Sequence, residues 1–250
     1  MPLQERVLLL QKASDNTQLQ VVQMELCRRD PVYWFNHFAW TFDPRDGKGD
    51  LPFDLYPFQE WFIPLLKKKI DAQADIDIEK SRTMGASWMV MGLFLWYWLF
   101  VPGSSFLVGS ITQDEVDQNL IDPEDTLFGK IRFLYQYLPP WMKPKEITDK
   151  HLVFKNHDNG SSIGGKAPTS NFGRGSRKTA IFFDEVAFWQ WGRSAYASAS
   201  QTTKCRIMCS TPNGKYDPYG ERMTNPEAIR YTWPGREELA REKGLHHTKS

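Results

Sequence analysis

The sequence has few cysteines, no long apolar run and almost no net charge, and each of these shortages excludes a class of protein. Three cysteines without a C-x-x-C pair argue against a disulfide framework or a zinc site and favour a reducing compartment. The longest apolar block, residues 88–101, is shorter than the roughly 20 residues that span a bilayer, and the N-terminal residues are a poor signal peptide. We therefore expect a cytoplasmic protein without a membrane segment. The net charge of +1 means that binding to an anionic polymer requires a local patch.

Aromatic residues are abundant, with 10 Trp, 16 Phe and 9 Tyr in 250 residues, so the core should be rich in large rings. This length accommodates one large domain, or one domain with a small appendage. Helical patterns alternate with short apolar strands, which predicts an α/β fold with a mainly parallel sheet.

The predicted elements follow from periodicity and punctuation. Helices are expected within residues 1–40, with a break at Asp30-Pro31, and at 58–69, 88–101 and 112–122, the last with Thr112 as N-cap. Strands are expected at 74–80, 106–109, 151–156, 161–167, 178–186 and from 204. Residues 41–57, dense in Asp, Gly and Pro, are expected to form a loop.

Residues 80–87, KSRTMGAS, nearly match a phosphate-binding loop between a predicted strand and the apolar helix. The usual pattern is G-x-x-x-x-G-K-[ST], with the lysine on the β- and γ-phosphates and the hydroxyl on magnesium. Gly85 and Ser87 match, but Ala86 stands in the lysine position and Lys80 in the first glycine position. The octet alone is weak evidence, because a strand-turn-helix junction without a ligand can have the same sequence. Its place before a long helix favours phosphate binding.

Two acids follow the apolar strand in IFFDE, residues 181–185. This pattern suits magnesium and water chemistry at a phosphate-transfer site. Asp184 would hold the metal, directly or through water, and Glu185 would orient and deprotonate the attacking water. The alternative is an exposed strand end with two solvated acids.

Two further motifs are individually weak. In MCSTPNG, Ser210 and Thr211 would lie beside the γ-phosphate and sense its hydrolysis, although the motif is also an ordinary strand-to-turn junction. In LYPFQEWF, Gln59 would pair with the adenine edge while Tyr56 or Phe58 packs on the ring. A core aromatic cluster explains the same residues equally well.

The order LYPFQ, KSRTMGAS, IFFDE, CSTPNG resembles the ATPase domain of the large terminase subunit of tailed phages. That family is the motor that pumps double-stranded DNA into an empty capsid. The resemblance covers about residues 30–235, and the four motifs are specific together although none is specific alone. It implies a P-loop NTPase of the additional-strand, RecA/terminase-like type that uses ATP and Mg²⁺.

In this family the phosphate loop often deviates, with an arginine in third position and sometimes its lysine in front. The resemblance therefore implies that Lys80 is the phosphate lysine, that Arg82 lies beside it, and that Ser87 supplies the magnesium hydroxyl. The other nucleotide-binding residues of the loop would be Ser81, Thr83, Met84, Gly85 and Ala86. A lysine side chain reaches about 6 Å and acts on phosphate as a point charge, so the displaced position is compatible with the role.

Residues 164–179, GGKAPTSNFGRGSRKT, contain four basic residues and no acid. In the rings that this family forms, an arginine of one subunit reaches the γ-phosphate held by its neighbour, which contributes about 10³–10⁵ in rate. The resemblance makes Arg174 the first candidate for this arginine and Arg177 the second. A solvated loop, or a loop that contacts DNA phosphates with steep salt dependence, are the alternatives.

The resemblance implies double-stranded DNA, a portal protein, a small terminase subunit and further copies of the chain in a ring as partners, in the host cytoplasm. Family members usually carry a second, RNase-H-like nuclease domain, and the 36 residues after position 214 are too few for one. We therefore expect a fragment without nuclease activity. Its expected parts are an N-terminal helical segment (1–50), a P-loop ATPase core (51–214), and the start of a lid subdomain or tail (215–250).

Two other functions compete with the motor. A helicase-like translocase shares a glutamine motif, a D-E pair and an S/T-rich third motif, but a second motor domain is absent from the sequence. A catalytically silent nucleotide-binding scaffold would explain Ala86 as a mark of decay, although the intact Asp184-Glu185 pair argues against it.

Overall fold

The computed structural model describes residues 1–43, 49–80, 85–118, 126–211, 213 and 230–232. Its helices are α1 (Leu3–Ser14), α2 (Thr17–Arg29), α3 (Pro31–Phe38), α4 (Pro57–Asp71), α5 (Ala86–Phe100), α6 (Gln113–Val116), α7 (Leu127–Gln136) and α8 (Gly192–Ala199), with the 3₁₀ turns η2 (Pro140–Met142) and η3 (Val186–Phe188). Its strands are β1 (Trp40–Asp43), β2 (Gly49–Pro52), β3 (Ile76–Glu79), β4 (Ser105–Gly109), β5 (Ile147–Lys150), β6 (Val153–Asn156), β7 (Ser162–Gly165), β8 (Ala180–Asp184), β9 (Arg206–Ser210) and β10 (Arg230–Thr232).

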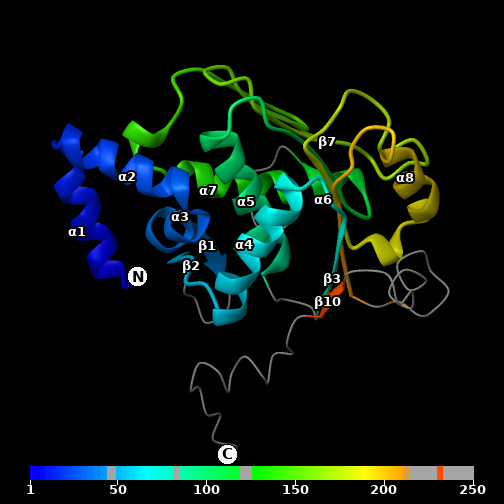
Figure 1. The fold of residues 1–250 in the computed structure, drawn as a ribbon, viewed down its shortest axis with the longest axis horizontal. Coiled ribbons are helices and arrows are strands. Elements are labelled where there is room, and N and C mark those ends of the chain that lie inside the picture. The colour runs from blue at the N-terminus through cyan, green and yellow to red at the C-terminus, as the bar shows by residue number, and fades with distance from the viewer. Residues whose placement is uncertain (44–48, 81–84, 119–125, 212, 214–229, 233–250) are drawn as a thin grey trace, which may run out of the picture.

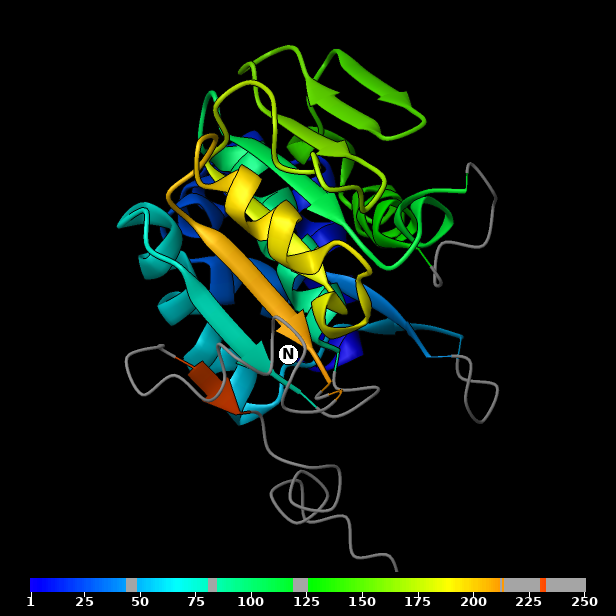
Figure 2. The same cartoon turned by 90° about the vertical axis from the view of Figure 1, so that its right-hand side faces the viewer.

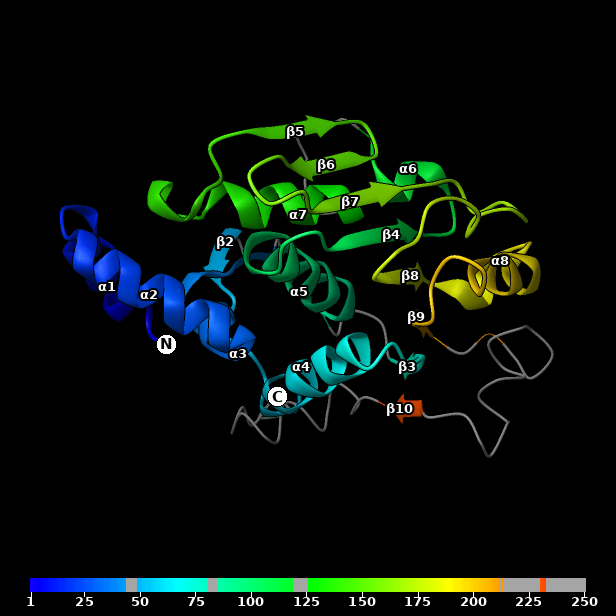
Figure 3. The same cartoon turned by 45° about the horizontal axis from the view of Figure 1, so that its top comes forward.

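Eight of these strands form one sheet in the order β10-β3-β9-β8-β4-β7-β6-β5 (Figure 3). The pairs from β10 to β7 are parallel, and β6 and β5 extend the sheet by antiparallel pairing. The expected α/β fold with a mainly parallel sheet is therefore confirmed. The neighbouring β3, β9, β8 and β4 place their carboxyl ends along one edge, where α/β folds commonly bind ligands.

Alternate residues of the central strands enter two separate apolar clusters, one on each face of the sheet. In β8, Ala180 and Phe182 join the larger cluster with α3, α4 and α5, whereas Ile181 and Phe183 join the smaller one under α8. Figure 2 shows α8, in yellow, lying across the sheet near the orange strand β9. The continuous apolar run of β8 is explained by this burial on both faces.

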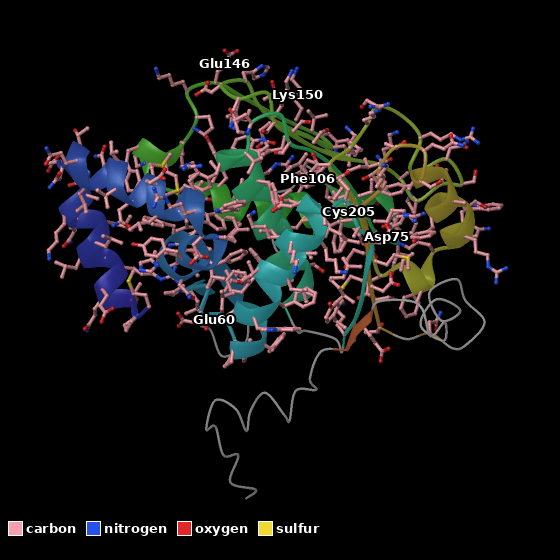
Figure 4. The ribbon with its side chains drawn as sticks, in the orientation of Figure 1. Glu60, Asp75, Phe106, Glu146, Lys150 and Cys205 are labelled. Atoms are coloured by element: carbon pink, nitrogen blue, oxygen red, sulfur yellow. The ribbon has the colours of Figure 1, made fainter. Side chains whose placement is uncertain are left out.

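The apolar helix predicted at 88–101 is α5, and twelve of its fifteen residues are buried. It lies between the sheet on one side and α3 and α4 on the other (Figure 1, Figure 3). Figure 4 shows Phe106 and Cys205 in the interior, whereas Glu60, Glu146 and Lys150 lie at the periphery. Within the part of the chain that the structure describes, no helix is both long and apolar enough to cross a bilayer.

The N-terminal region is helical, as predicted, and its two breaks have identifiable caps. The side chain of Asn16 accepts the N–H of Leu19 (3.0 Å) at the start of α2. At the predicted break, Asp30 accepts the N–H of Val32 (2.8 Å), and Pro31 occupies the first position of α3. Capping side chains of this kind satisfy N–H groups that a helix end leaves without a partner.

Two local predictions differ from the structure: one predicted loop contains a hairpin, and one predicted helix is shorter than expected. Residues 41–57 were expected to be loop, but β1 and β2 pair there as an antiparallel hairpin. Thr112 does cap α6, accepting the N–H of Glu115 (3.2 Å). The helix nevertheless ends at Val116 rather than extending to 122, because the next residue, Asp117, is buried and turns to pair with Arg132 of α7 (2.7 Å).

Candidate nucleotide site

Three of the four motifs meet at the carboxyl edge of the parallel sheet. Lys80 follows β3, the Asp184-Glu185 pair ends β8, and Ser210 ends β9. The N–H of Lys80 donates to the carbonyl of Ser210 (3.1 Å), which continues the β3–β9 pairing past the end of the strand. The order of the strands thus brings residues more than 100 positions apart into one site.

Lys80 and Glu185 form the central contact of this edge. The ammonium of Lys80 lies 2.6 Å from Oε1 of Glu185, and the two side chains are 8% and 23% exposed. Burial lowers the pKa of Lys80, but the nearby Cys209, Asp184 and Glu185 outweigh this effect and raise the pKa of the lysine. Lys80 is therefore a protonated side chain that is fixed in the middle of the site by its ion pair with Glu185.

Ser87 and Asp184 form a second contact beside the first. The hydroxyl of Ser87, in the first turn of α5, donates to the two carboxylate oxygens of Asp184 (3.0 and 3.1 Å). Burial raises the pKa of Asp184 to about 6, and the nearby Glu185 adds to the effect, while Lys80 opposes it. A buried carboxylate of this kind gains from any cation placed against it.

Ser87 and Asp184 also suit a magnesium ion chemically. Mg²⁺ prefers oxygen ligands, and at nucleotide sites it is held by one or two side chains together with phosphates and waters. Among the described residues no group of three or more His, Cys, Asp or Glu side chains is arranged to hold a metal. Ser87 and Asp184 could supply part of the ligands of such an ion, with phosphates and waters supplying others.

Glu185 has an unusual backbone and divides its two oxygens between different partners. Its φ of 50° lies in the left-handed region, which costs a non-glycine residue of order 1–3 kcal/mol and is frequent at functional sites. Oε1 accepts from Lys80, whereas Oε2 accepts from the hydroxyl of Ser210 (3.4 Å) and from the N–H and hydroxyl of Thr211 (3.3 and 3.4 Å). The third motif therefore contacts the acid pair directly.

The start of α5 packs closely against Gln59 of the LYPFQEWF motif. Gly85 has φ +71°, and a Cβ added to it would come 3.2 Å from Nε2 of Gln59. Gln59 is 1% exposed, and its Oε1 accepts the N–H of Tyr56 (3.0 Å). Tyr56 and Phe58 stack on each other (5.7 Å between centroids) and pack against the core. These contacts agree with the alternative of a core aromatic cluster, and the adenine role of Gln59 and Tyr56 stays a prediction.

Four residues of the predicted phosphate loop, Ser81, Arg82, Thr83 and Met84, lie outside the described residues. The other four, Lys80, Gly85, Ala86 and Ser87, are described, and only Lys80 and Ser87 contact the acid pair through their side chains.

Known structures match this fold, although neither a protein-family model nor a curated protein matches the sequence. The large terminase of bacteriophage HK97 matches with a TM-score of 0.60 and 14% identity, over 84% of this chain and 44% of that one. The large terminase of a thermophilic bacteriophage in complex with ADP matches with a TM-score of 0.54 and 14% identity, over 77% and 48%. The chain has the fold of a phage large-terminase ATPase domain.

The separate ATPase domain of the Thermus phage P74-26 large terminase also matches, with a TM-score of 0.50 and 17% identity, over 70% of this chain and 83% of that domain. By contrast, this chain spans less than half the length of the two other terminases above. The likeness thus identifies the terminase ATPase fold, and the domain limits predicted at residues 50 and 214 stay predictions.

The two candidate arginines lie on the basic segment ahead of β8. Arg174 and Arg177 are both exposed, and within the described residues neither forms an ion pair or contacts the acid pair. The ammonium of Lys166 donates to the carbonyl of Arg174 (2.6 Å), so the backbone at Arg174 is fixed while its guanidinium faces outward. Their roles stay predictions.

Two residues that act on Asp184 were not predicted from the sequence. Trp189 donates its indole N–H to the carbonyl of Asp184 (2.9 Å). Lys130 of α7 is 9% exposed, and its charge lowers the pKa of Asp184. A tryptophan five residues after the acid is a weak local signal, whereas Lys130 is brought near only by the packing of α7 against α5.

Proposed function

We propose that this chain is the ATP-hydrolysing motor domain of a viral DNA-packaging terminase, which drives double-stranded DNA into a procapsid. The contact that carries the proposal is the 2.6 Å approach of Lys80 to Glu185. It supports the view that a lysine at the front of the loop reaches the space where the acid pair would act on a γ-phosphate. The terminase ATPase fold supports the same function.

The proposed roles follow from the contacts. Lys80 binds the β- and γ-phosphates as a point charge, and Ser87 with Asp184 would hold Mg²⁺. When bound, this ion would supply positive charge that neutralises the phosphates. Glu185 orients the attacking water and accepts its proton, and its left-handed backbone is of the kind that is frequent at functional sites.

The third motif is proposed to report hydrolysis. Ser210 and Thr211 donate hydrogen bonds to Oε2 of Glu185, so a movement of this carboxylate would alter the hydrogen bonds at the end of β9. The same serine hydroxyl accepts the N–H of Ala187 (3.3 Å) after the acid pair. Loss of the γ-phosphate would alter these contacts together.

Arg174, or failing it Arg177, is proposed to act on the nucleotide of a neighbouring copy in a ring. Its exposed guanidinium and fixed backbone support this role. Double-stranded DNA, a portal protein and a small terminase subunit are the further proposed partners, and the host cytoplasm is the proposed location.

Steady-state ATP hydrolysis with Mg²⁺, measured over a wide range of protein concentration, tests the function. The wild type should turn over faster per protomer as concentration rises. Lys80→Ala and Glu185→Gln should abolish turnover, and Glu185→Gln should still bind nucleotide. Lys204→Ala, which removes an exposed lysine after α8, is the matched control and should be neutral.

A mixing experiment separates a trans arginine from a cis one. Arg174→Ala keeps its own acid pair, and Glu185→Gln keeps its arginine, so a mixture of the two should regain activity that neither has alone. Bound nucleotide without turnover under any condition would favour the silent scaffold. Duplex unwinding stimulated by single strands would favour the helicase. Normal turnover of Lys80→Ala would refute the role of the front lysine.

A further inference from the structure

The segment that carries Arg174 is anchored by one buried ring. Phe172 is 0% exposed and lies edge-on to Trp189, with 4.9 Å between centroids and 90° between planes. It also lies 5.1 Å from the ring of Phe183 in β8. An exposed arginine thus stands two residues from an aromatic anchor in the smaller core cluster.

The backbone next to this anchor is equally constrained. A Cβ at Gly173 would meet the backbone of Ala199, in α8, at 2.3 Å. The N–H of Gly173 donates to the hydroxyl of Ser198 (3.2 Å), and the N–H of Arg174 donates to the carbonyl of Asn171 (3.0 Å). The backbone before Arg174 therefore has little freedom to move apart from α8.

The partner of the anchor ring also contacts the acid pair. The indole N–H of Trp189 donates to the carbonyl of Asp184 (2.9 Å), and its ring packs on Phe183 (5.4 Å). A Cβ at Gly109, at the end of β4, would approach Phe172 to 2.4 Å and Trp189 to 2.8 Å. The two rings therefore fill a closely fitted space over the ends of β4 and β8.

We propose that Phe172 and Trp189 are positioning residues that connect the arginine segment, residues 166–178, to the acid pair. Nucleotide bound at Asp184 and Glu185 would then determine the position of the arginine that reaches the next subunit. This inference rests on the proposed function. The connection runs from Asp184 through the Trp189 indole and the Phe172 ring to Arg174, and each step is a hydrogen bond, a ring contact or adjacent backbone. Closely packed groups of this kind transmit a displacement instead of absorbing it.

Hydrogen exchange of residues 166–178, with and without Mg²⁺ and ATPγS, tests the connection without requiring a ring. Nucleotide should change the exchange of this segment in the wild type. In Phe172→Leu, which removes the ring but keeps an apolar side chain, nucleotide should still bind within about twofold, and the response of the segment should shrink about 2-fold to 30-fold. Phe154→Leu is the matched control, because Phe154 is equally buried and packs on Trp98 (4.7 Å) in the other cluster.

Trp189→Phe is the second variant, because it keeps an aromatic ring and removes the N–H donated to Asp184, together with part of the buried indole. It should also bind nucleotide and lose the response, which tests the connection even if Phe172→Leu folds poorly. The inference would be overturned if bound nucleotide left the hydrogen exchange of residues 166–178 unchanged in the wild type. It would also be overturned if both variants showed the same change in exchange as the wild type. Absence of nucleotide binding in the wild type would overturn the proposed function, and the connection with it.

The mixture assay gives a second readout that a purely structural role would not move. Phe172→Leu is added to the Glu185→Gln donor and mixed with Arg174→Ala. The donor should lose its ability to restore activity by about 2-fold to 30-fold, while Phe154→Leu in the same donor should not. If the original mixture restores activity and the Phe172→Leu donor restores it equally, the function stands and the inference fails.

Discussion

Replacement of Asp184 by asparagine should stabilise the protein at neutral pH. The carboxylate is 8% exposed, and burial raises its pKa to about 6. An amide has nearly the same shape and can still accept a hydrogen bond from the hydroxyl of Ser87. The substitution therefore removes a buried charge with little loss of packing.

The expected gain in the free energy of unfolding follows from the difference between the pKa of Asp184 in the folded and unfolded states. The difference between a pKa of about 6 in the folded state and about 3.9 in the unfolded chain corresponds to about 3 kcal/mol at roughly 1.4 kcal/mol per pKa unit. Between these values the folded wild type binds the extra proton, so its stability falls as pH rises from about 4 through about 6. The advantage of asparagine should be absent below about pH 4 and complete above about pH 6.

Urea denaturation and thermal melting across pH measure this difference. Near pH 7.5 Asp184→Asn should melt about 6–12 °C higher, at roughly 2–4 °C per kcal/mol for a protein of this size. Mg²⁺ with ATPγS should raise the melting temperature of the wild type more than that of the variant, because a cation relieves the same cost. Equal stability at pH 7.5, or a gain that does not depend on pH, would refute the reasoning.

Asp75→Asn is the matched control with the opposite sign. Burial would raise the pKa of Asp75, but hydrogen bonds from Arg206 (3.0 Å from Nε) and Tyr196 (2.8 Å) hold it below its usual range. This variant should lose stability at neutral pH, and the loss should shrink as pH falls through the pKa of Asp75. The same chemical change then gives opposite effects at the two sites.

Three further substitutions or modifications have definite outcomes. Gly85→Ala should cost about 1–2 kcal/mol for its left-handed backbone and weaken nucleotide binding, measured by melting and titration. Gly92→Ala should lower stability by about 1–3 kcal/mol through overpacking, because its Cβ would meet the ring of Phe35 at 2.5 Å. The three cysteines are buried, and burial raises the pKa of each thiol. A thiol reagent at pH 8 should leave them unmodified in the native protein and modify all three after denaturation.

The sequence predicted elements whose signals are local and missed those that depend on distant contacts. The apolar run of β8 was sufficient because both faces of the strand are buried. The hairpin at β1 and β2 was missed because it packs against α7 and the residue that follows it: Phe42 meets Phe133 of α7 edge-on (6.3 Å), and Trp40 stacks on Tyr137, the C-cap residue (4.9 Å). Such tertiary packing overrides the turn-like composition of the segment.

The candidate site shows the same division. Lys80, Ser87 and the acid pair were singled out by their motifs and by the family resemblance, and they lie together because parallel strands bring their carboxyl ends to one edge of the sheet. The split of the Glu185 oxygens, and the contact of Trp189 with Asp184, depend on side-chain directions that no local pattern specifies. The loop residues between Lys80 and Gly85 lie outside the described part of the chain, so their predicted contacts stay predictions.

The front position of the lysine follows from what the helix and the strand can each accommodate. Ala86 begins α5 and is 2% exposed within the larger core cluster. A lysine at this position would therefore have the base of its side chain buried among apolar residues. Lys80 instead leaves the end of β3, where its N–H is fixed to β9 and only its ammonium needs compensation, which Glu185 supplies at 2.6 Å. One ammonium cannot fully neutralise both a γ-phosphate and this carboxylate. We therefore expect phosphate binding to weaken the Lys80–Glu185 pair and free Oε1 of this carboxylate for a new partner, which would link occupancy of the site to the contacts that Glu185 makes.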